Sequence, residues 1–219
     1  MDWSFIGKYH PQLAEAAKLT LVLGISGVVL SILIGVICAW ILAEKIPVLR
    51  WIVKIYVELA RNTPLLIQIF FIYYGLPRIG LSLSPEVCGI AGLAFLGGAY
   101  MCETFRSGLE AVSTTQIESA QALGLSGFQI IWNITLPQAI ARSIPGLTAN
   151  VIFLLKETSV FSAISLMDLM FTAKDLIGLY YKTTESLFLL VIFYLLILLP
   201  VSVFGTWLER KVRYAEFGD

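Results

Sequence analysis

Long apolar stretches separated by short polar segments dominate this chain. Stretches of this length and apolarity are typical of membrane-spanning helices. The pattern predicts five spans, at about 19–43, 62–77, 87–103, 144–167 and 186–208. We therefore expect an all-α polytopic membrane protein in which residues 1–219 form a single transmembrane domain.

Small residues form one face of the first predicted span. Gly24, Gly27, Ser31 and Gly35 recur every three or four positions, so a neighbouring helix can approach this face closely. The preceding residues 1–18 carry aromatic side chains of the kind enriched at membrane surfaces, and we expect them to form an interfacial lead-in to the span.

A stripe of charged residues marks the segment 48–61. Arg50, Lys54, Glu58 and Arg61 are four, four and three positions apart and therefore share one side of a helix. The pattern favours an amphipathic helix that lies at the membrane interface or lines a wet surface, with an ordinary solvated face as the alternative. A proline shortly after the segment predicts the end of this helix.

Two pairs of charged residues lie in or beside predicted spans. Glu103 and Arg106 follow the third span three positions apart, so the spacing predicts an ion pair. Lys156 and Glu157 fall near the middle of the fourth span, where charged residues normally face a bundle interior or a wet cavity. A purely structural ion pair between these two is the alternative, although sequence neighbours point about 100° apart on a helix.

A polar stretch, residues 115–137, interrupts the apolar pattern. Thr115 and Glu118 have the spacing of a capping box, in which a hydroxyl and a carboxylate satisfy the first free N–H groups of a helix. Ser126 and Gln129 repeat this spacing. The stretch therefore predicts two short helices in series.

Gly124, between the two boxes, suits the left-handed position that ends a helix, and Pro137 predicts that the second helix stops or bends. Two small capped helices between membrane spans are typical of a docking element for a partner outside the bilayer. An ordinary interfacial loop is the alternative.

Composition limits the functions that are open to the chain. Of its 219 residues 14% are charged and 58% hydrophobic, whereas a soluble domain carries about 25% charged residues. The formal net charge of zero gives no reason to expect nucleic acid as a partner. The three cysteines lack C-x-x-C spacing and His10 is the one histidine, so we expect buried cysteines and neither a metal site nor a His-based catalytic centre.

The sequence contains no phosphate-loop motif G-x-x-x-x-G-K-[ST], so we expect no ATP site of that kind and no cofactor in this chain. Motifs of hydrolases are missing as well, and we expect no enzymatic activity. The distribution of Lys and Arg favours an N-terminus outside and a C-terminus in the cytoplasm. This orientation places the loop 107–142 in the cytoplasm and a polar loop, 168–185, outside.

The spacing within residues 118–137 resembles the EAA loop of ABC-importer membrane subunits. That loop reads E-A-A, three residues, G, nine residues and I-x-L-P. Glu118, Gly124 and Pro137 stand at matching positions, and Ser119 replaces the first alanine.

Three further segments resemble permeases of the polar amino acid uptake subfamily. RNTPLL at 61–66 is similar to its R-G-T-P-L-L element, and GAYMCETFRSG at 98–108 is similar to G-A-Y-x-x-E-x-x-R-x-G. LLKETS at 154–159 is similar to L-L-K-D-T-S, with Glu157 in place of aspartate. Together and in this order the matches are highly specific.

The resemblance implies a type I ABC-importer permease fold in the cytoplasmic membrane of a prokaryote. It implies four kinds of partner: a second permease copy or paralogue, cytoplasmic ATPase subunits that bind Mg-ATP, an extracytoplasmic solute-binding protein, and the membrane lipid around the permease. The residues expected to couple to the ATPase are Glu118, Ser119, Ala120, Gly124, Leu136 and Pro137. The residues expected to line the path of a polar amino acid are Glu103, Lys156, Glu157, Thr158 and Ser159.

Asn150 is a weaker candidate for the path, because it lies about 120° from Lys156 around the helix. Two other functions stay open at this point. A stand-alone ion-coupled carrier for a small polar solute would also use mid-span charges, but such carriers often show inverted repeats, and we find no convincing repeat in the sequence. A non-transporting scaffold, in which the motifs serve packing alone, is the other.

Overall fold

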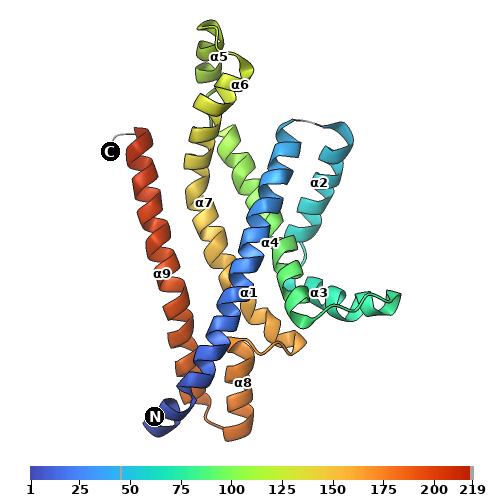
Figure 1. Cartoon of the computed structure of the whole chain (residues 1–219), viewed down its shortest axis with the longest axis vertical. Coiled ribbons are helices and arrows are strands. Elements are labelled where there is room, and N and C mark those ends of the chain that lie inside the picture. The colour runs from blue at the N-terminus through green and yellow to red at the C-terminus, as the bar shows by residue number, and fades with distance from the viewer. Residues whose placement is uncertain (45, 218–219) are drawn as a thin grey trace.

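The computed structural model describes residues 1–44 and 46–217, with only the backbone described for 213–217. These residues are almost entirely helical and contain no strand (Figure 1). Four helical stretches among them are long and apolar enough to cross a membrane, and a bent pair of helices makes a fifth candidate. The predicted all-α polytopic fold is therefore confirmed. The four stretches are Trp3–Ala43, Pro85–Glu110, Gly127–Ile164 and Thr183–Val212.

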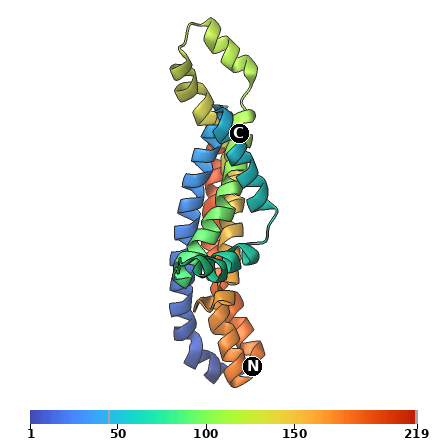
Figure 2. The ribbon, with the colours of Figure 1, turned by 90° about the vertical axis from the view of Figure 1, so that its right-hand side faces the viewer.

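Four long helices, α1, α4, α7 and α9, run along the longest axis of the molecule (Figure 1). Helices α5 and α6 project beyond this bundle at the end where α9 finishes, and the N-terminus lies at the opposite end (Figure 2). The nine α-helices in the described part of the chain are α1 (Trp3–Ala43), α2 (Pro47–Arg61), α3 (Leu65–Phe70), α4 (Pro85–Glu110), α5 (Thr114–Ala122), α6 (Gly127–Ile130), α7 (Leu136–Glu157), α8 (Leu169–Tyr180) and α9 (Thr183–Phe217).

The small-residue face predicted on the first span is confirmed as a helix contact. Gly27 and Ser31 pack on Leu93 of α4, and the Ser31 hydroxyl lies 3.3 Å from the Leu93 carbonyl oxygen. Gly35 lies so close to Met101 that a Cβ at position 35 would come within 2.9 Å of the Met101 carbonyl carbon. Because these positions lack bulk, the backbones of α1 and α4 meet directly, and this pair forms the largest helix contact in the molecule.

Helix α1 begins at Trp3, so residues 1–18 form no separate interfacial lead-in and that prediction is wrong. Asp2 caps the helix, and its carboxylate accepts a hydrogen bond from the Phe5 N–H at 3.1 Å. Phe5 and Leu13 are buried against α8 and α9 instead of facing a membrane surface. At about 1.5 Å per residue, α1 is about 60 Å long, roughly twice the thickness of the hydrocarbon core of a bilayer.

The predicted end of the 48–61 helix before Pro64 is confirmed, and the segment 62–77 counts as a candidate span only together with α2, as a bent pair. Helix α2 meets the following helical stretch, Leu65–Ile79, at a bend of 107°. The buried Gln68 fastens this bend, because its Nε2 lies 2.9 Å from the Ala60 carbonyl oxygen and 2.8 Å from the Thr63 hydroxyl. One amide thus ties both sides of the bend together, which explains a polar residue within an apolar segment.

The polar loop predicted at 168–185 is largely helix α8, and this prediction is also wrong. The Asp168 carboxylate caps the helix by accepting the Phe171 N–H at 2.9 Å. Leu169 and Leu176, seven positions apart, share one face of α8 and pack with α1 and α9. The helix therefore forms because its apolar positions have helical spacing between the charged ones.

Helix α7 ends at Glu157, so Lys156 and Glu157 lie at a helix end and not at the midpoint of the predicted span 144–167. A 3₁₀ turn, Thr158–Ile164, continues the stretch beyond them. On the other side, the π-helical turn Ile131–Thr135 joins α7 to α6 without a break. The fourth crossing therefore starts earlier in the sequence than its apolar residues alone indicate.

The two short helices predicted in the polar stretch are present as α5 and α6. The box at Ser126 and Gln129 is confirmed, with the Ser126 N–H donating to Gln129 Oε1 at 2.8 Å. The box predicted at Thr115 and Glu118 is wrong, because α5 begins at Thr114 and Ser113, two positions before Thr115, takes the cap position.

Gly124 adopts a φ of 80°, as predicted for the residue that ends the first short helix. Pro137 does not end the second one. It lies in the first turn of α7, directly after the π-helical turn, where a missing N–H is tolerated.

Candidate functional site

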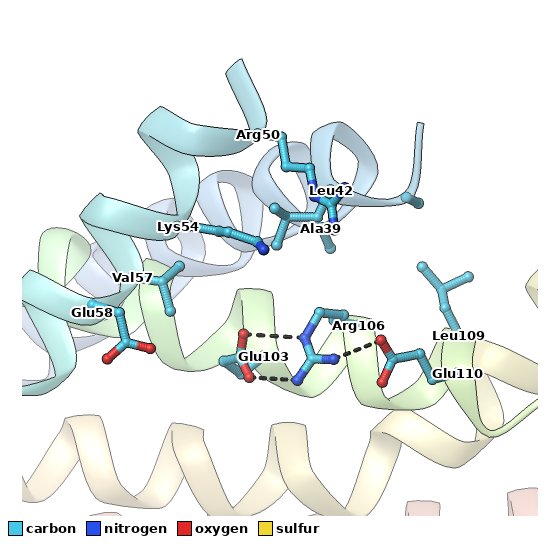
Figure 3. Close-up of a pocket in the computed structure, with 11 residues that line it drawn as sticks. Ala39, Leu42, Arg50, Lys54, Val57, Glu58, Glu103, Arg106, Leu109 and Glu110 are labelled. Atoms are coloured by element: carbon cyan, nitrogen blue, oxygen red, sulfur yellow. Dashed lines mark hydrogen bonds and ion pairs between the residues drawn. The ribbon is translucent and has the colours of Figure 1, made fainter. Parts of the chain in front are cut away.

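Charged side chains of α4 form the centre of the polar region inside the bundle (Figure 3). Arg106 holds Glu103 in a bidentate pair, with Nε 3.2 Å from Oε1 and Nη2 2.8 Å from Oε2, and this confirms the predicted ion pair. The third nitrogen, Nη1, donates to Glu110 at 2.6 Å. Two carboxylates therefore neutralise one guanidinium and fix its orientation.

The charged stripe of α2 faces this group of residues on α4. Arg61 Nη1 lies 3.7 Å from Glu103 Oε2, and the Arg61 guanidinium lies 5.6 Å from the centre of the Tyr100 ring. The other three stripe residues line a cavity that Glu103 also lines. The apolar side of α2, including Trp51 and Ile55, is exposed on the outside. Of the alternatives for α2, the structure supports a helix that lines a wet surface, because Lys54 and Glu58 are exposed on the wall of this cavity.

A cavity of about 580 Å³ lies between the α2–α3 bend, α4 and α7. Its polar walls include Arg61, Thr63, Tyr100 and Glu157. The Glu157 side chain is half-buried and forms no ion pair with any residue that the structure describes, Lys156 included. The cavity therefore presents the unpaired carboxylate of Glu157 together with the guanidinium of Arg61. Among the described residues, the one acid near this guanidinium is Glu103, at the long distance of 3.7 Å.

A second cavity, of about 500 Å³, adjoins the first, because Arg61 and Tyr100 line both. It lies between α4 and α7, and Glu103 and Asn150 contribute to its walls. The Asn150 amide nitrogen donates to the Thr104 hydroxyl at 2.8 Å. Asn150 thus belongs to the polar lining, although the sequence ranked it below Lys156.

The structure brings two of the five predicted path residues, Glu103 and Glu157, to these adjoining cavities. Lys156 is exposed and lies outside the residues that line them. Thr158 is fully buried, donates its hydroxyl to a backbone carbonyl of α7 at 2.7 Å and packs beside α1. Ser159 accepts a hydrogen bond at its carbonyl oxygen from a neighbouring serine. Roles of these last three residues in a solute path stay predictions.

Sequence reasoning did not select Arg61 or Tyr100, although both stand in segments that carried the family resemblance. The sequence contained part of the signal for Arg61, since this residue ends the charged stripe of α2. The spacing could not show which part of the protein the stripe faces, because that depends on how α2 packs against α4.

The residues that the resemblance assigned to coupling lie on the projecting segment of α5 and α6 and at the start of α7 (Figure 2). Glu118 is exposed, and so are the large apolar side chains of Leu123, at 80%, and Phe128, at 71%. Ala120, also on α5, is buried. A carboxylate beside exposed apolar side chains at the tip of a molecule is typical of a protein-binding surface.

Comparisons with known proteins agree with this geometry. Residues 31–214 match the family described as the binding-protein-dependent transport system inner membrane component. The probable amino-acid permease protein YxeN of Bacillus subtilis (strain 168) is 34% identical over 215 residues, covering 97% of this chain and 96% of the relative. The probable glutamine ABC transporter permease protein GlnP of the same organism is 35% identical over 178 residues, covering 80% of this chain and 82% of the relative.

Among solved structures, a chain from an amino acid ABC transporter crystallised with histidines superposes with a TM-score of 0.90 at 29% identity. The match covers 96% of this chain and 99% of the other. The sequence match, the helix arrangement and the projecting α5–α6 segment lead to one conclusion. This chain belongs to the family of inner-membrane components of binding-protein-dependent transport systems, and it is a multi-pass permease subunit of the cytoplasmic membrane.

Proposed function

We propose that this chain is the transmembrane subunit of an ATP-driven importer that moves a polar amino acid into the cell by alternating access. The observation that carries the proposal is the presence of Arg61 and Glu157 on the walls of one cavity. A free amino acid carries a carboxylate, which a guanidinium binds bidentately, and an ammonium, which a carboxylate binds. The volume of about 580 Å³ lies in the range of small-molecule sites, which is about 300–1,000 Å³.

In this proposal Glu103 holds the Arg61 side chain when the cavity contains no solute. Arg106 already satisfies both oxygens of Glu103, so the contact to Arg61 is long and easily exchanged for a solute carboxylate. The Tyr100 ring beneath the guanidinium keeps it in position during the exchange. The names of the relatives, a probable amino-acid permease and a probable glutamine permease, support the class of solute.

The partners in this proposal are two cytoplasmic ATPase subunits with Mg-ATP, a second permease copy or paralogue, and an extracytoplasmic solute-binding protein. The ATPase docks on α5 and α6, where Glu118, Ser119, Ala120 and Gly124 lie, and movement passes into α7 at Leu136 and Pro137. The start of α1 and the end of α9 lie at opposite ends of the molecule, and the end of α9 lies on the side of α5 and α6 (Figure 1). With the ATPase docked on α5 and α6, this arrangement supports an N-terminus outside and a C-terminus in the cytoplasm.

Uptake by the complete importer in liposomes tests the solute site. Glu157→Gln should lower amino-acid uptake about tenfold or more, since a charge-assisted hydrogen bond contributes about 1.5–3 kcal/mol. Lys156→Gln is the matched control, because Lys156 is the neighbouring charge outside the cavity, and it should leave uptake near the wild-type rate. Equal losses in the two variants would contradict the site. Uptake by this chain alone, without ATP or partners, would instead favour the ion-coupled carrier.

A second experiment tests the coupling surface. Glu118→Lys should leave the permease in the membrane but uncouple uptake from ATP hydrolysis, because it reverses the charge of an exposed group on α5. Gly124→Arg should act in the same way. Stable co-purification of the ATPase with both variants, together with normal uptake, would exclude this surface as the coupling element.

A further inference from the structure

A third cavity, of about 610 Å³, lies between the end of α1, the inner face of α2 and the last turns of α4 (Figure 3). Glu103 forms part of its wall and also part of the wall of the 500 Å³ cavity beside Arg61. Glu110 marks its other end, and α4 stops at this residue, four positions before α5 begins. The third cavity therefore adjoins the 500 Å³ cavity, which in turn adjoins the proposed solute site, and it lies on the side of the coupling helices.

The charges in this cavity divide into a satisfied group and an unsatisfied one. Arg106 is neutralised by Glu103 and Glu110 through the short contacts described above. Arg50 and Lys54, from α2, have no carboxylate within ion-pair distance among the residues that the structure describes, and the Lys54 ammonium lies 5.8 Å from the centre of the exposed Trp51 ring. Figure 3 shows Lys54 reaching from α2 into the space above the ion pairs of α4.

The unsatisfied charges form a polarised row on one face of α2. Arg50, Lys54 and Glu58 are four positions apart, so each step along the helix is about 6 Å. Glu58 accepts one hydrogen bond, from the Asn62 amide at 3.0 Å, and has no ion-pair partner among the described residues. Two cations followed by one carboxylate match a small zwitterion whose anionic group and ammonium are a few ångströms apart.

We propose that this cavity is a second binding site for a zwitterionic amino acid, occupied after the solute leaves the Arg61 site. Arg50 and Lys54 bind the carboxylate, and Glu58 binds the ammonium. The inference rests on the proposed function, because the first site supplies the solute. It also has a physiological consequence, since an amino acid that accumulates in the cytoplasm would occupy this site and slow further release.

A phosphatidylethanolamine headgroup offers the same zwitterionic chemistry, and exposed apolar residues on α1 and α2 lie near the cavity, among them Trp40 and Trp51. The observation that favours a free solute is the wall that Glu103 and Arg106 share, which places the cavity in a row of adjoining cavities that begins at the Arg61 site. A lipid headgroup at this position would obstruct that row.

Equilibrium binding distinguishes these possibilities. The complete importer is placed in nanodiscs without its binding protein, and radiolabelled samples of each of the twenty standard L-amino acids are titrated. The best-bound amino acid should occupy two sites per permease chain. The double variant Arg50→Gln/Lys54→Gln should weaken one class of sites about tenfold to hundredfold and leave the other unchanged.

Two controls make the result specific. Lys18→Gln/Arg78→Gln makes the same chemical changes at exposed positions away from the cavity and should leave both classes intact. Nanodiscs of phosphatidylglycerol alone and nanodiscs that contain phosphatidylethanolamine should give the same affinities. A tenfold weakening by phosphatidylethanolamine would assign the cavity to lipid and overturn the inference.

The two proposals fail in different ways. A single site per chain that is lost in Arg61→Gln and kept in the Arg50→Gln/Lys54→Gln variant overturns the second site alone. The absence of any amino-acid binding, together with no solute-dependent uptake, overturns the proposed function and the second site together.

Discussion

The contact between α1 and α4 can be tested by adding one methyl group at Gly35. A Cβ at this position would lie 2.9 Å from both the backbone nitrogen of Cys102 and the carbonyl carbon of Met101, and closer still to the Met101 Cβ. Backbone atoms cannot rotate out of the way as a flexible side chain can. The Gly35→Ala variant therefore forces the two helix axes apart by about 0.5–1 Å along the most extensive contact of the fold.

The cost of this change follows from two opposing effects. Over-packing of this kind costs about 1–3 kcal/mol, and replacing glycine by alanine inside a helix returns about 1 kcal/mol. Gly7 supplies the matched control, because it lies in the same helix and a Cβ there would meet no atom within 4 Å. Gly7→Ala should therefore show the gain alone. We expect the two variants to differ by about 1–3 kcal/mol, with Gly35→Ala the less stable.

The measurement is thermal or denaturant unfolding of the purified permease in detergent, followed by circular dichroism. Helical content at low temperature should match the wild type in both variants. A difference between their unfolding midpoints then reports the packing of α1 against α4 and not a loss of helix. Equal unfolding midpoints for the two variants would refute the reasoning, since they would mean that α1 and α4 are not in direct backbone contact.

Three further outcomes are expected of the purified permease. Burial raises the pKa of Asp168 from 3.8 to about 6, so its neutral form stabilises the fold fully below pH 3.8 and this contribution is lost as the pH rises through about 6. Asp168→Asn keeps the helix cap and should remove this contribution, which changes the free energy of unfolding by about 3 kcal/mol between low and neutral pH. Thermal unfolding at a series of pH values measures it. The same pH dependence of the unfolding midpoint in variant and wild type would contradict the prediction. Gly124→Ala should destabilise the α5–α6 segment by about 1 kcal/mol because of its positive φ, measured by amide exchange, whereas Gly127→Ala, equally open but without a positive φ, should not. Arg106→Lys should lower stability by about 1–3 kcal/mol, because lysine cannot donate to both oxygens of Glu103 and also to Glu110, and an unchanged midpoint would show that this ion-pair group is only a surface feature.

The sequence predicts the parts of this fold that depend on local spacing. Gly27 and Gly35 share a face with helical periodicity, and that face is the contact with α4. Glu103 and Arg106 are three positions apart and form the expected pair. The Ser126 box also depends on neighbours a few residues apart, and it is present.

The parts that were not predictable depend on contacts between distant segments. A proline at position 64 indicates a break, but the 107° angle is set by Gln68 bonding back across the bend. The sequence ranked Lys156 above Asn150 from their positions on an isolated helix. The packing of α7 against α4 decides which of the two residues reaches the cavities. It turns Asn150 toward Thr104 and leaves Lys156 exposed.

The unbroken helical stretch Gly127–Ile164 has a mechanical consequence. Phe128 is exposed near one end of it and Glu157 lies near the other, about 40 Å away at the rise of an α-helix. A lever of this length converts a small angle into a large displacement: a tilt of about 5° at α6 moves the Glu157 end by about 3 Å, which is roughly the length of a hydrogen bond. A slight rotation of the partner proposed for α5 and α6 is therefore enough to make or break a contact at the proposed solute site.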